Sequence, residues 1–281
     1  MKIIEKSILV EALGVRISKL VVKAPLIAQK AAPGQFVAVM TVEVGERVPL
    51  TVVEKDPAAG TITLIVQELG LTTSLLGRLK AGDSLYAIVG PLGHATEIKN
   101  YSRVILVGGG VGIAEIYPVA KALKAAGNQI TTILGSRTKD LLILEPELRK
   151  VSDNFYVTTD DGSYGRKGFV TDILKELLTK YDVPTTKYGL IYAVGPLPMM
   201  KNVALASQEA KIKTLVSLNS LMVDATGMCG CCRVTVGGKA YFTCIDGPEF
   251  DASQVDWDEL AKRNRVYEEK ENHICKLNKL L

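Results

Sequence analysis

Histidine is nearly missing from this sequence. Among 281 residues there are only two, His94 and His273. A hydrolase that relies on a histidine base, or a metal centre made of imidazoles, therefore has almost no residues to use. This scarcity favours chemistry performed by a bound cofactor, and we expect no catalytic side chain.

Three further features are missing. No apolar run approaches the roughly 20 residues that span a bilayer, and the first residues, Met-Lys-Ile-Ile-Glu-Lys, do not form a signal-peptide pattern. The formal net charge is only +4, and lysines alternate with glutamates instead of forming a basic stripe. We therefore expect a cytoplasmic protein with neither nucleic acid nor a membrane as a partner.

The chain does contain a cluster of cysteines. Four of its five cysteines lie in one stretch, in which Cys229, Cys232 and Cys244 have the spacing C-x2-C-x11-C and Asp224 stands five residues before Cys229. Plant-type [2Fe–2S] loops read C-x4-C-x2-C…C, so Asp224 occupies the place of a first cysteine. We predict an iron–sulfur site with three thiolates and one carboxylate. A zinc site and a set of unrelated buried thiols are the alternatives.

The expected elements divide the chain into three parts. Up to residue 97, about six short β-branched segments separated by turns predict a small antiparallel β-barrel, interrupted by a helix at about residues 73–80. Residues 98–219 alternate strands with helices, which indicates a doubly wound parallel sheet. Residues 220–281 contain the cysteine segment and a charged tail with a helical pattern. The predicted fold class is thus β plus α/β with a small C-terminal module.

Arg47, Pro49, Leu50 and Thr51 lie on an expected strand of the barrel. Arginine can neutralise a pyrophosphate, and backbone groups beside a stiff proline can face a flavin ring. An ordinary edge strand is the alternative.

Gly70, Thr72 and Thr73 stand at the start of the expected short helix. Free N–H groups and the helix dipole favour phosphate at such a point. Simple N-capping by one of the threonines explains a single hydroxyl and is the alternative.

A glycine-rich loop, Gly109-Gly110-Val111-Gly112, follows the first strand of the second part and opens a helix. Its glycines permit close approach of a dinucleotide pyrophosphate. The G-x-G-x-x-G pattern is not met, because Glu115 takes the third glycine position. The strand and helix around the loop still favour nucleotide binding.

Two more segments follow the ends of expected parallel strands, where open α/β sheets bind ligands. One contains Asp161, and the other contains Gly195, Pro196 and Met199. Either could be turn chemistry alone. Their shared edge favours a binding site.

Taken in order, these motifs resemble the ferredoxin–NADP reductase superfamily, and within it the electron-transfer subunits related to the iron–sulfur subunit of dihydroorotate dehydrogenase. The likeness extends to about residue 250. Two features, Asp224 in place of a cysteine and the segment Thr-Asp-Asp-Gly-Ser-Tyr-Gly-x-Lys-Gly, are most similar to the small (alpha) subunits of NADH-dependent reduced ferredoxin:NADP oxidoreductases. These are electron-bifurcating complexes, whose small subunit is also described as that of sulfide dehydrogenase.

The resemblance implies the cofactors and their places. FAD would lie on the barrel at residues 47–51 and 70–73, and NAD(H) would bind residues 109–112, Asp161 and residues 195–200 and deliver hydride to the flavin N5. A [2Fe–2S] cluster would be held by Asp224, Cys229, Cys232 and Cys244. The coenzyme is suggested to be NADH, although Arg137 and Lys139 could meet a 2′-phosphate of NADPH.

The resemblance also implies a partner. The chain would form a heterodimer with a larger subunit that carries a second FAD and [4Fe–4S] clusters, and through it would exchange electrons with ferredoxin. An electron-transfer subunit of dihydroorotate dehydrogenase is the alternative, as is a zinc-stabilised binding module without enzymatic activity. Cys231, where the family more usually has alanine, has no assigned role, and Cys275 is expected to be structural.

Overall fold

The computed structural model describes residues 1–179, 188–268 and 270, and the chain divides into two compact units. One unit comprises Met1–His94, Asn219–Gly247 and Asp256–Leu281, and the other comprises Ala95–Leu218 and Pro248–Val255. The cysteine segment therefore belongs to the same unit as the N-terminal strands. None of the helices in the described ranges combines the length and hydrophobicity that a bilayer-spanning segment needs.

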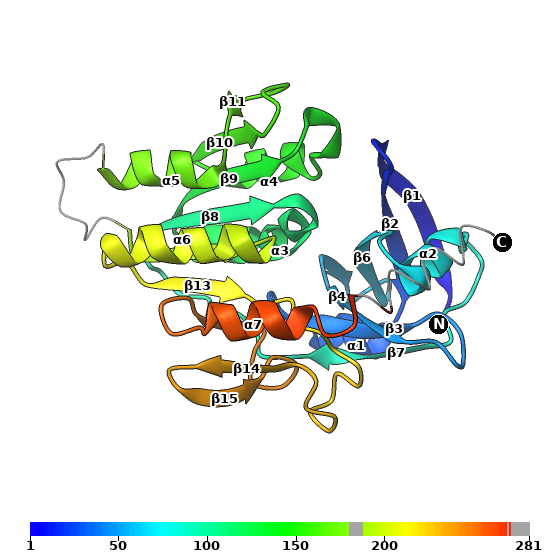
Figure 1. Ribbon diagram of the computed structural model, residues 1–281. Coiled ribbons are helices and arrows are strands. Elements are labelled where there is room, and N and C mark those ends of the chain that lie inside the picture. The colour runs from blue at the N-terminus through cyan, green and yellow to red at the C-terminus, as the bar shows by residue number, and fades with distance from the viewer. Residues whose placement is uncertain (180–187, 269, 271–281) are drawn as a thin grey trace. The chain divides into compact units, whose positions relative to one another are not determined.

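The N-terminal strands form two antiparallel sheets, ordered β1-β2-β6-β5 and β4-β3-β7 (Figure 1). Apolar side chains alternate along them, and the inward set, which includes Leu20, Val22, Ile62 and Leu64, is fully buried in one core. The predicted antiparallel β architecture is confirmed. The strands are β1 (Ile3–Ala12), β2 (Val15–Lys23), β3 (Phe36–Met40), β4 (Arg47–Thr51), β5 (Glu54–Asp56), β6 (Thr61–Gln67) and β7 (Ala87–Leu92).

Two helices accompany these strands. Helix α2 (Leu71–Arg78) is the predicted one, and it begins two residues earlier than expected. Helix α1 (Pro25–Lys30) was not predicted, because a six-residue helix is too short to show helical periodicity. Its Pro25 occupies the first helical position, where a missing N–H is harmless.

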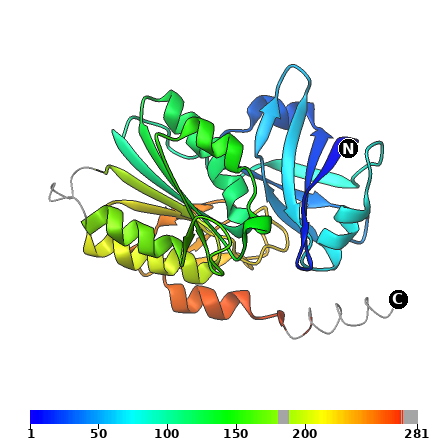
Figure 2. The same ribbon diagram turned by 90° about the horizontal axis from the view of Figure 1, so that it is seen from above.

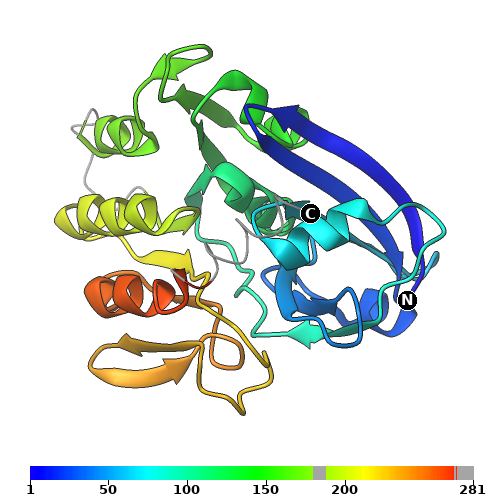
Figure 3. The ribbon, with the colours of Figure 1, turned by 45° about the vertical axis from the view of Figure 1, so that its right-hand side comes forward.

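The cysteine segment packs on the barrel instead of forming a separate globule. Met222, Ala225, Cys232 and Cys244 share a buried cluster with two residues of β3, Phe36 and Ala38. Between Cys232 and Cys244, β14 (Arg233–Val236) and β15 (Lys239–Phe242) form a hairpin, and α7 (Trp257–Asn264) contacts β14. Figure 3 shows the hairpin in orange beside the orange-red helix. The tail is therefore helical as predicted, over residues 257–264.

The second unit contains a seven-stranded sheet in the order β11-β10-β9-β8-β12-β13-β16, with every strand but β16 parallel to its neighbours. The predicted doubly wound sheet is confirmed. The strands are β8 (Arg103–Gly109), β9 (Gln129–Ser136), β10 (Asn154–Thr159), β11 (Arg166–Lys167), β12 (Leu190–Val194), β13 (Thr214–Ser217) and β16 (Glu249–Asp251).

Helices cover both faces of this sheet. Figure 2 shows α3 (Ile113–Ala125) and α4 (Glu145–Val151) on one face, and α5 (Val170–Thr179) and α6 (Leu197–Glu209) on the other. Two short 3₁₀ turns, η1 (Gly110–Gly112) and η2 (Lys139–Leu141), follow β8 and β9. Strand β16 was not predicted, since Glu-Phe-Asp is too short and polar to show a strand pattern.

Candidate cofactor sites

The glycine-rich loop and the segment after β12 lie against each other. A Cβ atom on Gly109 would stand 2.4 Å from the Met199 Sδ, and one on Gly112 would stand 2.7 Å from the Val194 carbonyl oxygen. A Cβ on Gly195 would stand 2.7 Å from the Met199 Cε. A side chain at position 112 would push against the backbone of the other segment, whereas one at position 109 or 195 would first displace the Met199 side chain. Glycine here leaves a backbone cradle without side chains at the carboxyl edge of the sheet, which fits the pyrophosphate of a dinucleotide.

Asp161 lies in the loop that follows β10, and the structure connects this loop to the end of β9. The Asp161 backbone N–H donates to the Arg137 carbonyl oxygen at 3.2 Å, and the Lys139 N–H donates to the Ser163 hydroxyl at 2.9 Å. Hydrogen bonds from the Ser163 N–H and hydroxyl hold the pKa of Asp161 below its usual value. The loop therefore offers an ionised carboxylate beside two basic residues.

The predicted flavin residues on β4 divide between its two faces. Leu50 is buried in the barrel core, with Val48 packed against the same core. Arg47, Pro49 and Thr51 alternate with them and share the opposite face. Leu50 can therefore meet a flavin only through its backbone, whereas the other three present side chains on one surface.

The start of α2 uses one of its threonines as a cap. The Thr73 hydroxyl accepts hydrogen bonds from the N–H groups of Leu69 and Gly70 at 2.9 and 3.0 Å. The Thr72 hydroxyl donates to Glu46 Oε2 at 3.2 Å. The first helical bond is made by the Ser74 N–H, so the N–H groups before it point out of the helix end, as an anion site requires.

Among the predicted cluster ligands, the structure brings Cys232 and Cys244 into direct contact. Their Sγ atoms are 3.2 Å apart, and both residues are buried. Two thiolates on one tetrahedral metal stand about 3.8 Å apart for metal–sulfur bonds of about 2.3 Å. Burial, and after it the hydrogen bond with Cys232, raises the pKa of Cys244 to about 12. Metal binding there would therefore release a proton.

The other two predicted ligands lie in the loop before Cys232. Cys229 is exposed, and although burial opposes its ionisation, hydrogen bonds from the backbone of Cys231 and Asp224 bring its pKa below the usual value. The Asp224 carboxylate is ionised, since the hydrogen bond from the Thr226 hydroxyl and the nearby Arg47 charge lower its pKa. Cys231 is partly buried, and its Sγ faces the Cys229 carbonyl oxygen at 4.0 Å.

These donors fit an iron–sulfur group in kind, since they comprise three thiols and one carboxylate within 21 positions of one loop-rich segment. Over residues 1–179, 188–268 and 270, however, no three or more His, Cys, Asp or Glu side chains gather as they would around a metal ion. The structure therefore joins one pair of the predicted ligands and leaves the other two in the neighbouring loop. His273 and Cys275 lie outside the described residues.

Sequence reasoning missed the residues that hold this loop. The Thr226 N–H donates to Asp224 Oδ2 at 3.0 Å, and Arg263 of α7 donates to the Cys231 carbonyl oxygen at 3.1 Å. The Asp246 carboxylate accepts from the Phe242 N–H at 2.7 Å. Such contacts have no local signal, apart from a hydroxyl two residues after an aspartate, which is typical of Asx-type turns.

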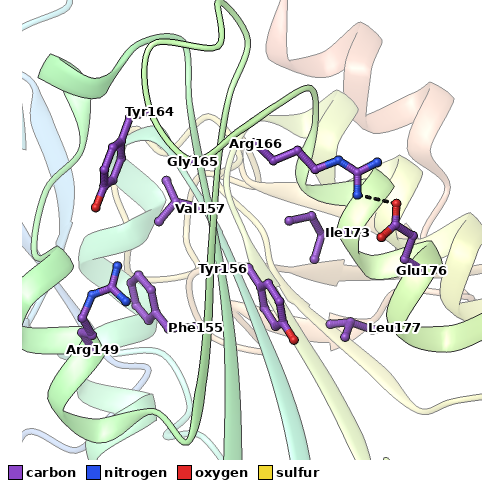
Figure 4. A pocket seen from close by; sticks show the side chains of 10 residues that line it. All are labelled: Arg149, Phe155, Tyr156, Val157, Tyr164, Gly165, Arg166, Ile173, Glu176 and Leu177. Carbon is purple, nitrogen blue, oxygen red and sulfur yellow. Dashed lines mark hydrogen bonds and ion pairs between the residues drawn. The ribbon is translucent and has the colours of Figure 1, made fainter. Parts of the chain in front are cut away.

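A cavity of about 610 Å³ in the second unit includes none of the predicted site residues (Figure 4). It lies beside the part of β10 that precedes its pairing with β11. The Arg149 Cζ lies over the Phe155 ring, 4.2 Å from the ring centre. Arg166 and Glu176 form an ion pair across its other side. Both arginines of the cavity have carboxylate partners, since Arg149 pairs with Glu145 at 2.6 Å. We therefore assign it no ligand.

Known proteins share these features. The family described as the iron–sulfur cluster binding domain of dihydroorotate dehydrogenase B matches residues 219–256, and the oxidoreductase NAD-binding domain matches residues 106–204. A Thermotoga maritima protein named dihydroorotate dehydrogenase B (NAD(+)), electron transfer subunit homolog, is 51% identical over 250 residues, which cover 89% of this chain and 86% of the relative.

Two solved structures extend the comparison. One is a chain from the structure of an NADH-dependent reduced ferredoxin-NADP oxidoreductase, reported for its insights into flavin-based electron bifurcation. It is 47% identical with a TM-score of 0.91 and covers 100% of this chain and 98% of that one. The ferredoxin-NADP+ reductase of Plasmodium falciparum is 15% identical with a TM-score of 0.59, over 78% of this chain and 95% of that one, and so shares the fold.

The predicted oxidoreductase with a nucleotide-binding domain and an iron–sulfur segment is confirmed by these matches. The cysteine segment, the glycine cradle and the strand order each correspond to a part of the same known architecture. The chain belongs to the family of the dihydroorotate dehydrogenase B electron transfer subunit and its homologues.

Proposed function

We propose that this chain passes electrons between NAD(H) and a [2Fe–2S] cluster by way of a bound FAD, as the small subunit of an NADH-dependent ferredoxin:NADP oxidoreductase that bifurcates electrons. The observation that carries the proposal is the likeness of the entire chain, at 47% identity, to a chain of such an enzyme. Asp224 supports it, because dihydroorotate dehydrogenase subunits are expected to have cysteine at that place.

Each unit has its own task in this proposal. In the first unit, Arg47 and the N–H groups at the start of α2 bind the FAD phosphates, with Pro49 and Thr51 beside the ring. Asp224, Cys229, Cys232 and Cys244 bind the cluster. In the second unit, the cradle of Gly109, Gly112 and Gly195 receives the nucleotide pyrophosphate.

The bound flavin supplies the chemistry that side chains lack, since it exchanges electrons in pairs with a nicotinamide and singly with an iron–sulfur cluster. The protein has to bind the cofactors, orient them toward each other and exclude water. None of these tasks needs a side-chain base. The scarcity of histidine agrees with this division of labour.

We further propose that the chain works with a larger subunit, which carries a second FAD and [4Fe–4S] clusters and exchanges electrons with ferredoxin. The names of the curated relatives support a multi-subunit assembly, because the Thermotoga protein is named as an electron transfer subunit homolog. The same name favours one alternative, an electron-transfer subunit of dihydroorotate dehydrogenase. Purification with the native partner decides between them: a partner that oxidises dihydroorotate would contradict the bifurcating assignment.

The first test is the visible spectrum of the chain purified without oxygen, together with its iron, flavin and zinc content. We expect flavin and two irons per chain, and bleaching of the spectrum by NADH. Cys232→Ser should lose iron but keep flavin, whereas Cys275→Ser, outside the predicted ligand set, should keep both. A colourless, zinc-containing chain would favour a binding module and contradict the redox function.

A further inference from the structure

Arg47 of β4 is in direct contact with Asp224 of the cysteine loop, although 177 positions separate them in the sequence. Its Nη1 donates to the Asp224 backbone oxygen at 2.6 Å and to Asp224 Oδ1 at 2.8 Å. Both side chains are partly buried, with 30% and 25% of their surfaces exposed. The flavin motif and the cluster motif, which the sequence presents as unrelated, therefore meet at one ion pair.

The orientation of Asp224 is determined from two sides. Arg47 binds Oδ1, while Oδ2 accepts hydrogen bonds from the N–H and the hydroxyl of Thr226. The next residue, Ala225, is in the left-handed region at φ 64° and is buried against β3. A non-glycine residue adopts that conformation only when its surroundings hold it there. The loop is thus positioned on the barrel by packing and by the ion pair together.

The same part of β4 also reaches the start of α2. Glu46, the neighbour of Arg47, accepts a hydrogen bond from Thr72 in the first turn of that helix. A guanidinium has five N–H donors in a fork, and both bonds to Asp224 come from a single nitrogen. The fork can therefore bind a second anion while it holds Asp224.

We propose that Arg47 is a positioning residue shared by the two redox sites: it holds the Asp224 carboxylate in the cluster loop and binds the FAD diphosphate with the rest of its guanidinium. This inference rests on the proposed function above. It makes Arg47 the residue through which FAD binding and the properties of the cluster are coupled.

The positive charge of Arg47 determines the direction in which the cluster midpoint potential should shift when the residue is replaced. A positive group hydrogen-bonded to a carboxylate ligand weakens the ligand as an electron donor and stabilises the more negative, reduced cluster. Removal of the charge should therefore move the cluster midpoint potential to a more negative value. It should also weaken FAD binding, by about tenfold or more, because a charge-assisted contact with a phosphate is lost.

The experiment uses the full chain loaded with FAD and cluster, and compares Arg47→Gln, Arg47→Lys and the unchanged protein. Arg78→Gln, an exposed arginine at the end of α2 in the same unit, is the matched control for charge. The measurements are the FAD dissociation constant, the iron content and the cluster midpoint potential followed by EPR. We expect both shifts in Arg47→Gln, smaller shifts in Arg47→Lys, and neither in Arg78→Gln.

The same Arg47 replacement in a protein that also carries Asp224→Cys separates a positioning role from a general structural one. In Asp224→Cys, which replaces the carboxylate by a thiolate, Arg47→Gln should still weaken FAD binding but should shift the cluster potential much less. Equal potential shifts in both backgrounds would show that Arg47 does not act through Asp224, and would overturn the inference.

Two other outcomes also overturn it. Weaker FAD binding with an unchanged cluster potential would assign Arg47 to the flavin alone, while the proposed function stands. An unchanged protein that takes up neither iron nor flavin would contradict the proposed function, and the contact between Arg47 and Asp224 would then be a structural ion pair only.

Discussion

Asp161 lies in a loop that is hydrogen-bonded to the backbone of Arg137 and Lys139, the two basic residues that could receive a 2′-phosphate. Its carboxylate is ionised. In many dinucleotide-binding sheets an acidic residue near the end of the second strand accepts a hydrogen bond from the ribose 2′-hydroxyl of NAD. Here Ser136 ends that strand, β9, and Asp161 follows the third strand, β10. We expect Asp161 to act in its place and to favour NADH, because an ionised carboxylate near a 2′-phosphate repels it.

We expect Asp161→Asn to shift the ratio of kcat/KM for NADH and NADPH by about tenfold toward NADPH, which corresponds to about 1.4 kcal/mol. The reason is the loss of repulsion while Arg137 and Lys139 remain. Steady-state kinetics with each coenzyme and a dye as electron acceptor measures this ratio. Asp160→Asn is the control, since Asp160 is also exposed and adjacent; a larger shift there than at Asp161 would contradict the assignment.

At the scale of elements, the start of α2 contains a side-chain cap at the point where we propose that phosphate binds. Thr73 satisfies two backbone N–H groups that would otherwise lack a partner, those of Leu69 and Gly70. Its hydroxyl therefore belongs to the helix end, and we expect any phosphate to bind the backbone N–H groups of the first turn instead. The N-cap residue itself is Gly70, and Thr73 caps from the third helical position, while the phosphate site stays a prediction.

Replacement of Thr73 should lower both the stability of the protein and its affinity for FAD. We expect Thr73→Val to lower the free energy of unfolding by about 1 kcal/mol, as loss of an N-terminal cap does, and to weaken FAD binding because the first turn loses its geometry. Urea denaturation and flavin fluorescence measure the two effects. Thr73→Ser keeps the hydroxyl and should restore both, and Ser74→Ala, the next residue along α2, should change little. An unchanged free energy of unfolding in Thr73→Val would show that this cap does not contribute to stability.

Local patterns predicted most of the elements. Helices α3 and α6, with 13 residues each, were located within a residue or two, since periodicity is strong over such lengths. Strand β12 has only five residues, but it is an uninterrupted apolar run and was located as well. The elements that were missed, α1, α4, β5, β11, β16 and the hairpin of β14 and β15, have at most seven residues each. Such short elements are stabilised by tertiary contacts instead of their own pattern.

At the scale of the whole molecule, one carboxyl ties three distant segments of the second unit together. Glu249 on β16 accepts hydrogen bonds from the Tyr192 hydroxyl at 2.9 Å and from the Thr96 hydroxyl. Tyr192 is fully buried in the middle of the sheet. Burial raises the pKa of Glu249, and the two hydrogen bonds offset this only in part.

This raised pKa predicts a pH dependence of stability. Below the ordinary pKa of a glutamate, Glu249 is protonated in the folded and unfolded chains alike, and no penalty arises. As the pH rises from that value through the higher pKa of the folded state, the unfolded chain releases the proton first, so the free energy of unfolding falls. We expect Glu249→Gln to remove this fall, so that the variant gains stability relative to the unchanged protein as the pH rises.

Thermal unfolding as a function of pH measures the effect. Glu209→Gln, at the exposed end of α6, is the matched control and should leave the pH profile unchanged. If the profile of Glu249→Gln parallels that of the unchanged protein, another group is responsible for the pH dependence.

The sequence by itself determined the kinds of donor and the local turns. Thiol spacing, the glycines at positions 109–112 and the apolar patterns of the longer strands and helices are local features, and such features can be recognised without knowledge of what packs against them. The tertiary structure alone decided which stretches meet. The contacts of Arg47 with Asp224 and of Tyr192 with Glu249 join segments 177 and 57 positions apart. Contacts of this kind depend on how complete sheets and loops pack, which no local spacing encodes.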